Sequence, residues 1–238
     1  MHVSRLIPLR PALLVVTFLA LQGCTNSPER PEPEPQANTS RAAPPAPSVD
    51  SRPTIIAFGD SISEGFGVQT GSSFPDQLQR RLDEGGFRYR VVNLGVSGDT
   101  TTGGLGRIDY ALSLKPSIVI LELGGNDGLR GIPVSSTKAN LEKMILKFRE
   151  GGSWVVLAGM TLPPNYGPDY IREFEAAYRD LAKKYKLTLI PFLMEDILTQ
   201  YKSRPGLMQR DGIHPSAEGH SIIADTVFRY LKPVIKKG

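Results

Sequence analysis

A serine, a histidine and an aspartate of this chain have the surroundings that nucleophilic catalysis requires. Ser61 closes a Gly-Asp-Ser triplet at the end of an apolar run, and Asp211 stands three residues before His214. A neutral serine hydroxyl is a weak nucleophile, so it needs a base that works near pH 7 and a carboxylate that orients and stabilises the imidazolium. We therefore predict acyl transfer with Ser61 as nucleophile, His214 as general base and Asp211 as its carboxylate partner.

Acyl transfer also requires hydrogen-bond donors for the oxyanion, and removing one donor commonly costs about 2.7 to 4 kcal/mol of transition-state stabilisation. Gly98 offers a backbone N–H with no side chain in the way, and Asn126 offers a side-chain amide after another apolar run. The backbone N–H of Ser61 is the third candidate. The sequence thus predicts an oxyanion hole formed by Ser61, Gly98 and Asn126.

Other residues of the same types favour structural roles. His220 falls near the apolar side of the last helical pattern, where a partly buried histidine with satisfied hydrogen bonds is the usual outcome. Asp60 is the rival carboxylate, but its place beside Ser61 favours hydrogen bonds that hold the nucleophile loop. Asp127 is also assigned a structural role. These comparisons leave His214 and Asp211 as the partners of Ser61.

Buried strands must carry these residues to a common place. Short apolar runs rich in β-branched residues are typical of strands buried on both faces. Helical patterns lie between them, and the alternation predicts an α/β domain whose parallel sheet is wrapped by helices. The expected strands are 54–58, 89–94, 117–123, 154–160 and 187–191, and the expected helices are 74–84, 104–114, 137–150, 170–184 and 216–231. Ligands bind such sheets at the carboxyl ends of the strands, where the candidate residues occur.

Four ordered blocks of the chain resemble the SGNH (GDSL) hydrolase superfamily, and the match covers essentially all of residues 54–238. Longer stretches are similar to its bacterial thioesterase I, lysophospholipase and arylesterase group. The four blocks are Gly59-Asp60-Ser61, Gly98, Gly124-x-Asn126-Asp127 and Asp211-x-x-His214. This resemblance implies a flavodoxin-like, three-layer α/β/α sandwich with five mostly parallel strands.

The same resemblance implies a serine esterase that cleaves acyl or aryl esters, thioesters and lysophospholipids. It places substrate contacts at Leu162, Pro163 and Asn165, with the acyl chain along 160–166. A mobile loop near 128–133 is expected to close over that chain. A carbohydrate O-deacetylase with the same triad is the alternative, and a non-catalytic envelope-binding lipoprotein is the rival from another class.

Composition excludes several other functions. The net charge of +4 comes from 28 Lys and Arg against 24 Asp and Glu, interspersed without a basic arm, which does not indicate a nucleic-acid surface. Cys24 is the single cysteine, so neither an intramolecular disulfide nor a Cys-rich zinc site can form. The stretch 65–70 begins like a dinucleotide-binding fingerprint but lacks the third glycine. We expect no metal, no cofactor and a monomeric enzyme.

The amino end has the pattern of a lipoprotein signal. Residues 1–23 carry Arg5 and Arg10, an apolar run at 12–21 and a small residue before Cys24, which resembles a bacterial lipobox with lipidation on that cysteine. An ordinary secretory signal is the alternative. Residues 24–53 contain eight prolines and few large apolar side chains, which is typical of a semi-rigid tether. Residues 54–238 form the hydrolase domain.

The expected location follows from this pattern. A lipidated Cys24 anchors the protein in the bacterial cell envelope. Thr25 follows the cysteine, and resemblance to enterobacterial lipoprotein sorting then favours the outer membrane, facing the periplasm. The membrane is therefore an expected partner through the lipid, beside a small-molecule substrate.

Overall fold

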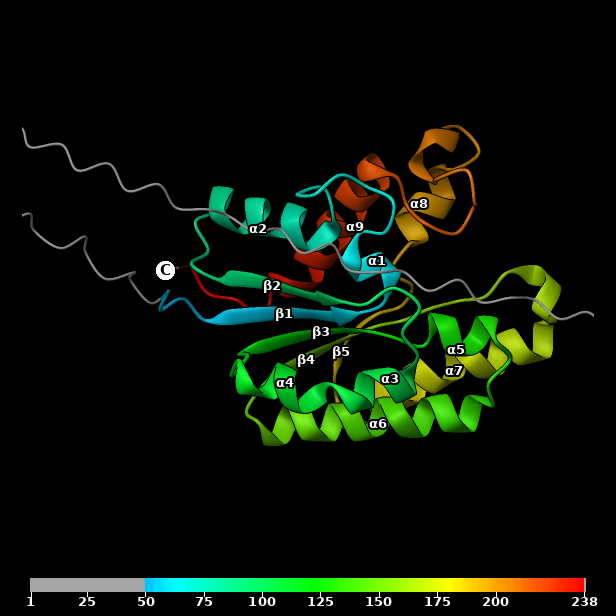
Figure 1. The fold of residues 1–238 in the computed structure, drawn as a ribbon, viewed down its shortest axis with the longest axis horizontal. Helices are drawn as coiled ribbons and strands as arrows, with labels where there is room; N and C mark the ends of the chain where they lie inside the picture. The colour runs from blue at the N-terminus through cyan, green and yellow to red at the C-terminus, as the bar shows by residue number, and fades with distance from the viewer. Residues whose placement is uncertain (1–49, 238) are drawn as a thin grey trace, which may run out of the picture. The chain divides into compact units, whose positions relative to one another are not determined.

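Five parallel strands form one sheet in the order β2-β1-β3-β4-β5 (Figure 1). The computed structural model describes residues 50–237, and the signal and tether expected at 1–23 and 24–53 lie outside them, apart from the last residues before β1. The strands are β1 (Thr54–Gly59), β2 (Arg90–Gly95), β3 (Ile118–Glu122), β4 (Trp154–Ala158) and β5 (Thr188–Ile190). This order confirms the predicted flavodoxin-like sheet.

Helices cover both faces of the sheet, with α2 and α9 on one side and α4, α6 and α7 on the other (Figure 1). The helices are α1 (Ser61–Glu64), α2 (Phe74–Glu84), α3 (Thr101–Gly106), α4 (Ile108–Ser113), α5 (Gly125–Leu129), α6 (Val134–Glu150), α7 (Pro168–Tyr185), α8 (Glu195–Gln200) and α9 (Ala217–Leu231), with short 3₁₀ turns η1 (Pro164–Tyr166) and η2 (Pro205–Leu207). The predicted three-layer α/β/α sandwich is confirmed.

β1 and β3 are buried over their whole length because each has a core on both of its faces. In β1, Ile55 and Ala57 belong to the core beneath α2 and α9, whereas Ile56 and Phe58 belong to the core beneath α6 and α7. Successive side chains of a strand point to opposite faces, so one continuous apolar run supplies both cores. Burial on both faces therefore holds the strand ends, and the residues that follow them, in fixed positions.

The helix predicted over 104–114 is wrong, because two short helices, α3 and α4, meet at Arg107. Three of the six residues of α3 are glycine, which lowers its helix propensity. Its first turn is capped by the Thr100 hydroxyl, which accepts a hydrogen bond from Gly103 N–H. Arg107 leaves the helical conformation, with a φ of −116°. This break lets the Arg107 side chain reach the ends of the strands.

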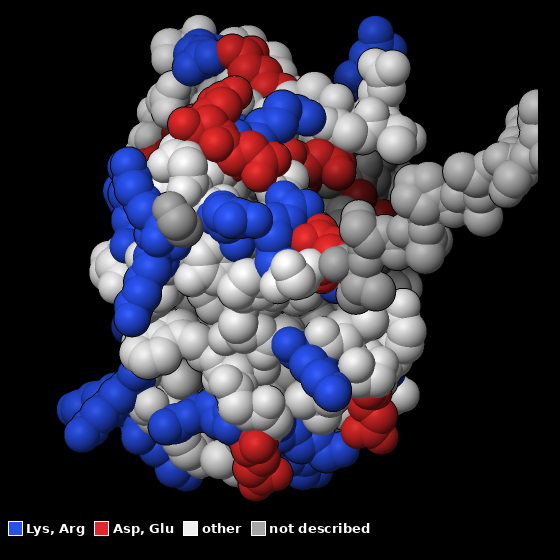
Figure 2. Space-filling view, turned by 90° about the vertical axis from the view of Figure 1, so that its left-hand side faces the viewer, with Lys and Arg blue, Asp and Glu red and all other residues white. Residues whose placement is uncertain are grey.

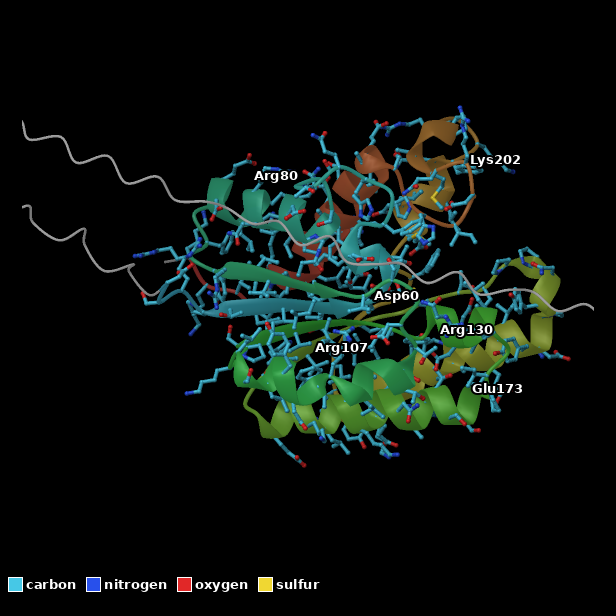
Figure 3. The ribbon with its side chains drawn as sticks, in the orientation of Figure 1. Asp60, Arg80, Arg107, Arg130, Glu173 and Lys202 are labelled. Carbon is cyan, nitrogen blue, oxygen red and sulfur yellow. The ribbon has the colours of Figure 1, made fainter. Side chains whose placement is uncertain are left out.

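From β1 the chain passes to β2 on one side of β1, and the later strands are added on its other side, beginning with β3. The order in which strands are added therefore reverses at β1. Ligands of open α/β sheets bind at such a reversal point. Figure 3 shows Asp60, Arg107 and Arg130 near the end of the sheet where the strands finish. The candidate site therefore lies where the topology favours one.

Charges of both signs share the side of the molecule seen in Figure 2, where Asp and Glu side chains lie among those of Lys and Arg. Arg52, for example, pairs with Asp50 and Asp83. Within residues 50–237, no helix combines the length and apolar character needed to cross a bilayer.

Candidate active site

Ser61 is the first residue of α1, a single helical turn that follows β1 directly. The Asp60 carboxylate caps this turn by accepting a hydrogen bond from Ile62 N–H at 3.1 Å, and Gly65 ends it with a φ of +87°. First-turn N–H groups have no partner within their helix, so the Ser61 N–H is free of the helical hydrogen-bond ladder. The sequence predicted a loop here, and the short capped helix presents the serine more rigidly.

Gly59 makes this arrangement possible because no side chain fits at its position. A Cβ atom on Gly59 would lie 2.1 Å from Ser63 Oγ and 2.2 Å from Glu122 Oε2. The carboxyl end of β1 thus packs directly against the turn that carries the nucleophile and against the end of β3. The glycine of the Gly-Asp-Ser triplet is required for this close approach.

The three predicted catalytic side chains form one hydrogen-bonded chain. His214 Nε2 lies 2.9 Å from Ser61 Oγ, and His214 Nδ1 lies 2.7 Å from Asp211 Oδ2. These distances are within the reach that proton transfer to a general base requires. The structure therefore brings together Ser61, His214 and Asp211, although Ser61 and His214 are 153 residues apart in the chain.

Asp211 also holds the histidine loop in shape. Its Oδ1 accepts hydrogen bonds from the backbone N–H groups of Ile213 at 2.9 Å and His214 at 3.0 Å. The hydrogen bond from His214 N–H, joined by those from the His214 ring and Ile213 N–H, lowers the pKa of Asp211 to about 2. Asp211 is therefore ionised over the pH range in which the enzyme would work.

Two residues that sequence reasoning missed tie the histidine loop to the nucleophile turn. The Phe66 N–H donates to Ser61 O at 3.0 Å, and the Phe66 ring packs against the His214 ring. The Gln209 side chain donates to Phe66 O at 2.7 Å and to Pro215 O at 2.9 Å. Neither residue belongs to a recognisable motif, so the sequence held no signal for these contacts.

Asn126 and Gly98 occupy different surroundings. Asn126, in α5, lines the same cavity as Ser61 and donates one amide hydrogen to Asp60 Oδ2 at 3.1 Å, which leaves the second hydrogen for a substrate oxygen. Gly98 follows β2 with a φ of +78°, and its carbonyl accepts from the Arg130 side chain at 2.9 Å. Gly98 is exposed and does not line that cavity.

The histidine and aspartates assigned structural roles are all buried. Asp127 accepts hydrogen bonds from the backbone and hydroxyl of Thr101 at 2.8 and 2.5 Å, which ties α3 to α5. His220 is fully buried rather than partly buried; its Nδ1 accepts from Phe74 N–H at 3.2 Å, but its Nε2 has no hydrogen-bond partner. Burial, with the positive charge of His214, lowers the pKa of His220 to about 4.

A cavity of about 480 Å³ opens beside the triad, between α5, the segment after β4 and α8. Its walls are mostly apolar: Leu129, Met160, Leu162, Pro163, Phe192, Met194, Leu198, Met208 and Ile213 line it. Such a space accepts a hydrocarbon chain or an aryl ring, with the scissile bond at Ser61.

Of the three substrate contacts that the resemblance implied, Leu162 and Pro163 line this cavity and Asn165 does not. The 3₁₀ turn η1 carries Asn165 to an exposed position outside the lining. The loop expected to move at 128–133 is held at two points, where Tyr166 OH donates to Leu129 O at 2.8 Å and Tyr170 OH donates to Ile132 O at 3.0 Å. Leu129 nevertheless borders the cavity.

Arg107 holds together the strand ends next to the site. Its guanidinium donates to Gly59 O at 2.8 Å, to Leu94 O at 2.7 Å and to Asp99 Oδ2 at 2.7 Å, and lies 4.0 Å from the Phe58 ring centroid. It thereby joins the ends of β1 and β2. In residues 50–237, no three His, Cys, Asp or Glu side chains are grouped so that they could hold a metal ion.

Comparisons with known proteins agree with this geometry. Residues 57–222 match the model of the GDSL-like Lipase/Acylhydrolase family. Esterase TesA of Pseudomonas aeruginosa is 43% identical over 183 residues, which cover 76% of this chain and 89% of that protein. Thioesterase 1/protease 1/lysophospholipase L1 of Escherichia coli K12 is 36% identical over 183 residues, which cover 76% and 85%.

Solved structures show the same similarity. The crystal structure of TesA superimposes with a TM-score of 0.71 at 43% identity, over 76% of this chain and 99% of that one. The psychrotrophic esterase EstA from Pseudoalteromonas sp., whose structure was solved inhibited by monoethylphosphonate, gives a TM-score of 0.71 at 32% identity, over 76% and 97%.

Proposed function

This chain belongs to the GDSL-like lipase/acylhydrolase family, and from that premise we propose that it hydrolyses carboxylic esters and thioesters through an acyl-enzyme on Ser61. The observation that carries the proposal is the hydrogen-bonded chain from Ser61 through His214 to Asp211, at the mouth of an apolar cavity. A nucleophile, a base and an orienting carboxylate in this order are the requirements of acyl transfer. These intact groups also argue against a non-catalytic lipoprotein.

The reaction proceeds in two halves. In the first, His214 Nε2 takes the proton of Ser61 Oγ while Oγ attacks the acyl carbon, and His214 then returns that proton to the leaving alcohol or thiol. In the second, His214 takes a proton from water, the hydroxide attacks the acyl-enzyme, and the proton goes back to Ser61 as the acid leaves. Asp211 stabilises the imidazolium in both halves without taking up the proton.

Three donors stabilise the oxyanion in this proposal. Two of them belong to residues that line the cavity: the Ser61 N–H at the start of α1 and the free amide hydrogen of Asn126. The third is the Gly98 N–H, in the exposed loop after the neighbouring strand β2 and outside the cavity lining. Replacing Asn126 by Ala should therefore lower kcat by about 10²-fold to 10³-fold.

The substrate class follows from the cavity. Its apolar lining favours longer acyl or aryl groups over acetyl groups, because each buried methylene contributes about 0.8 kcal/mol to binding. Relatives named arylesterase, from Vibrio mimicus, and thioesterase 1/protease 1/lysophospholipase L1 support the same classes of substrate. A carbohydrate O-deacetylase is the alternative, since an acetylxylan esterase from Xylanibacter ruminicola is also related, at 26% identity.

A substrate profile tests the proposal. Purified enzyme and its Ser61→Ala variant are assayed against aryl esters, acyl thioesters, lysophospholipids and acetylated glycans, with circular dichroism to check the variant's fold. We expect turnover of C6 to C12 acyl groups by the wild type and none by Ser61→Ala. Residual activity of the folded Ser61→Ala protein would refute the nucleophile. Much faster release of acetate from glycans than of longer acyl groups would replace the esterase proposal with the deacetylase.

The location is a separate proposal that rests on the amino end of the sequence. The pattern before Cys24 supports lipidation there, the prolines of 24–53 support a tether, and Thr25 supports an outer-membrane anchor facing the periplasm. Fractionation of cells carrying wild type or Cys24→Ala tests it. We expect wild type in the membrane fraction with a lipid-sized mass increment, and the variant without it. A free Cys24 thiol in a soluble wild-type protein would contradict the anchor. The expected oligomeric state is tested separately: light scattering of residues 54–238 should show a monomer.

A further inference from the structure

Glu122 is a fully buried carboxyl group directly beneath the turn that carries the nucleophile. It is the last residue of β3, and its side chain is 0% exposed. One oxygen, Oε2, accepts three hydrogen bonds: from Ser63 Oγ at 2.6 Å, from Ser63 N–H at 3.2 Å and from Asp60 N–H at 3.2 Å. Glu122 therefore holds the turn on both sides of Ser61. It does not line the cavity and cannot touch substrate there.

The second oxygen of Glu122 has different surroundings. Oε1 is buried and receives no hydrogen bond from a donor. A bare ionised oxygen in such a place costs several kcal/mol, on the order of what the folded state can spare. The buried group with which this carboxyl interacts is the neighbouring carboxyl of Asp60, itself only 3% exposed. Two neighbouring buried carboxyl groups are favoured when they share one proton, because two negative charges would repel each other there.

The surroundings of the two groups favour Glu122 as the holder of that proton. Burial and the negative charge of Asp60 raise the pKa of Glu122 well above its ordinary value. Burial raises the pKa of Asp60 too, but Asp60 accepts hydrogen bonds from Ile62 N–H, from Glu122 and from the Asn126 amide, all of which favour its ionised form. These contacts favour one negative charge for the pair, on Asp60, with Glu122 as the neutral acid.

We propose that Glu122 is a positioning residue that acts as a neutral acid: it accepts hydrogen bonds from the nucleophile turn and donates one to Asp60, which orients the Asn126 amide. Asp60 links the nucleophile turn to Asn126, because it accepts hydrogen bonds from Ile62 N–H in α1 and from Asn126 Nδ2 at 3.1 Å. Glu122 thereby sets two oxyanion donors, the Ser61 N–H and the Asn126 amide. The inference rests on the proposed esterase mechanism and adds a residue to it.

Glu122→Gln tests the protonation state because a glutamine side chain reproduces the neutral acid. Its carbonyl accepts from Ser63 and Asp60 N–H, and its amide donates to Asp60. We expect kcat within about threefold of wild type. Glu122→Ala removes both functions and should lower kcat by about 10²-fold to 10³-fold with little change in KM, the range for loss of an oxyanion donor. Equal loss of activity in Glu122→Gln and Glu122→Ala would overturn the proposal.

The pH profile separates this role from a merely structural one. When Glu122 of the wild type ionises, two negative charges face each other and the turn is displaced, so kcat should fall on the alkaline side. Glutamine cannot ionise, so the plateau of Glu122→Gln should extend to higher pH than that of the wild type. An alkaline limb that is identical in the two proteins would contradict the proposal.

Two further measurements do not depend on ester turnover. Infrared spectroscopy of the wild type at neutral pH should show the band of a buried protonated carboxylic acid, and this band should be absent from Glu122→Gln. Its persistence in that variant would show that the acid is another group and would overturn the proposal. Labelling of Ser61 by a serine-reactive phosphonate should slow by about 10²-fold in Glu122→Ala but not in Glu122→Gln. A wild type that carries the infrared band and reacts with the phosphonate, yet cleaves no ester, would refute the proposed function and leave this inference standing.

Discussion

The ring of Phe66 packs against the imidazole of His214, with 4.7 Å between the ring centroids and 42° between their planes. The backbone N–H of Phe66 donates a hydrogen bond to Ser61 O, and its carbonyl oxygen accepts one from the Gln209 side chain. One exposed residue thus joins the loop of the base to the turn of the nucleophile. The position of His214 over Ser61 therefore depends on a contact outside the triad.

Phe66→Ala should lower kcat/KM by about 2-fold to 12-fold. This range corresponds to the roughly 0.5 to 1.5 kcal/mol that an aromatic pair contributes beyond its buried area. Phe66 is 48% exposed, so its truncation leaves no core cavity, and Phe66→Trp should restore most of the activity. Tyr110→Ala, on α4 and 62% exposed, is the control and should leave kcat/KM unchanged. An unimpaired Phe66→Ala enzyme would show that the ring does not position the base.

Asp211→Asn should lower kcat by about 10⁴-fold while preserving the fold of the histidine loop. The asparagine oxygen can still accept from the N–H groups of Ile213 and His214, but an amide cannot stabilise the imidazolium. Asp211→Ala should lose both, and should therefore also lower the melting temperature. Since the pKa of Asp211 is about 2, Asp211 stays ionised down to pH 4 and should not cause a loss of wild-type activity above that pH. A loss of less than tenfold in Asp211→Asn would contradict the assigned role.

Leu162 variants should change the preference for acyl chain length. Leu162 is buried between the cavity and α5, where its methyl groups lie close to Gly128. Leu162→Ala lengthens the cavity, so kcat/KM for longer chains should rise relative to shorter ones by about fourfold for each extra methylene, or about 0.8 kcal/mol. The same change should cost about 2 to 5 kcal/mol of stability, so assays belong well below the melting temperature.

Leu198→Ala is the matched control for the chain-length experiment. Leu198 also lines the cavity but is 47% exposed at its outer edge. Its truncation should affect only the longest chains and leave stability nearly unchanged. An identical chain-length profile in the wild type and in Leu162→Ala would show that the acyl chain lies elsewhere.

His220 should make stability depend on pH between about 6.5 and 4. Its folded pKa is about 4, lowered first by burial and then by the charge of His214, with Asp76 acting in the opposite direction. The unfolded chain binds the proton at the ordinary pKa near 6.5, so it binds more protons than the folded state in this window. The free energy of unfolding should therefore fall as the pH drops from 6.5 to 4, by on the order of 3 kcal/mol, and this contribution should flatten below pH 4.

Urea unfolding of wild type and His220→Asn at several pH values checks this prediction. Asparagine can accept the hydrogen bond from Phe74 N–H but does not titrate. The stability difference between the two proteins should be largest near pH 7.5 and should shrink as the pH falls toward 4. A difference that stays constant with pH would mean that His220 is not the titrating group.

Arg107→Lys should destabilise the domain by about 1 to 3 kcal/mol, the cost of leaving acceptors such as Gly59 O and Leu94 O without a donor. Lysine keeps the charge opposite Asp99 but cannot reach both strand ends at once. Arg80→Lys is the control, since exposed Arg80 makes one hydrogen bond, to Gly71 O. Equal stability of the two variants in urea unfolding would show that the link between β1 and β2 is unimportant.

The sequence alone was sufficient for features that depend on neighbouring residues. α2 begins and ends where predicted, because Ser73 caps its start with a capping box and Gly85 follows its last residue. The buried strands were also identified, because each is an apolar run in the sequence. The triad residues were identified because each belongs to a short motif. The short helices α1, α5 and α8 were not predicted, because one turn or two is too short for a periodic apolar pattern.

Only the tertiary structure decided which distant side chains meet. In the sequence, Glu122 was only one residue of the expected strand 117–123. Its role beneath Ser63, 59 residues away in the chain, arises because β3 pairs with β1. Asn165 directly follows cavity-lining residues in the sequence, yet η1 places it at an exposed position outside the lining. Local pattern determines which elements form, because helix and strand periodicity act over neighbouring residues. The partners of a buried polar group are determined by how those elements pack, because only packing removes water from the group and requires that another part of the chain satisfy it.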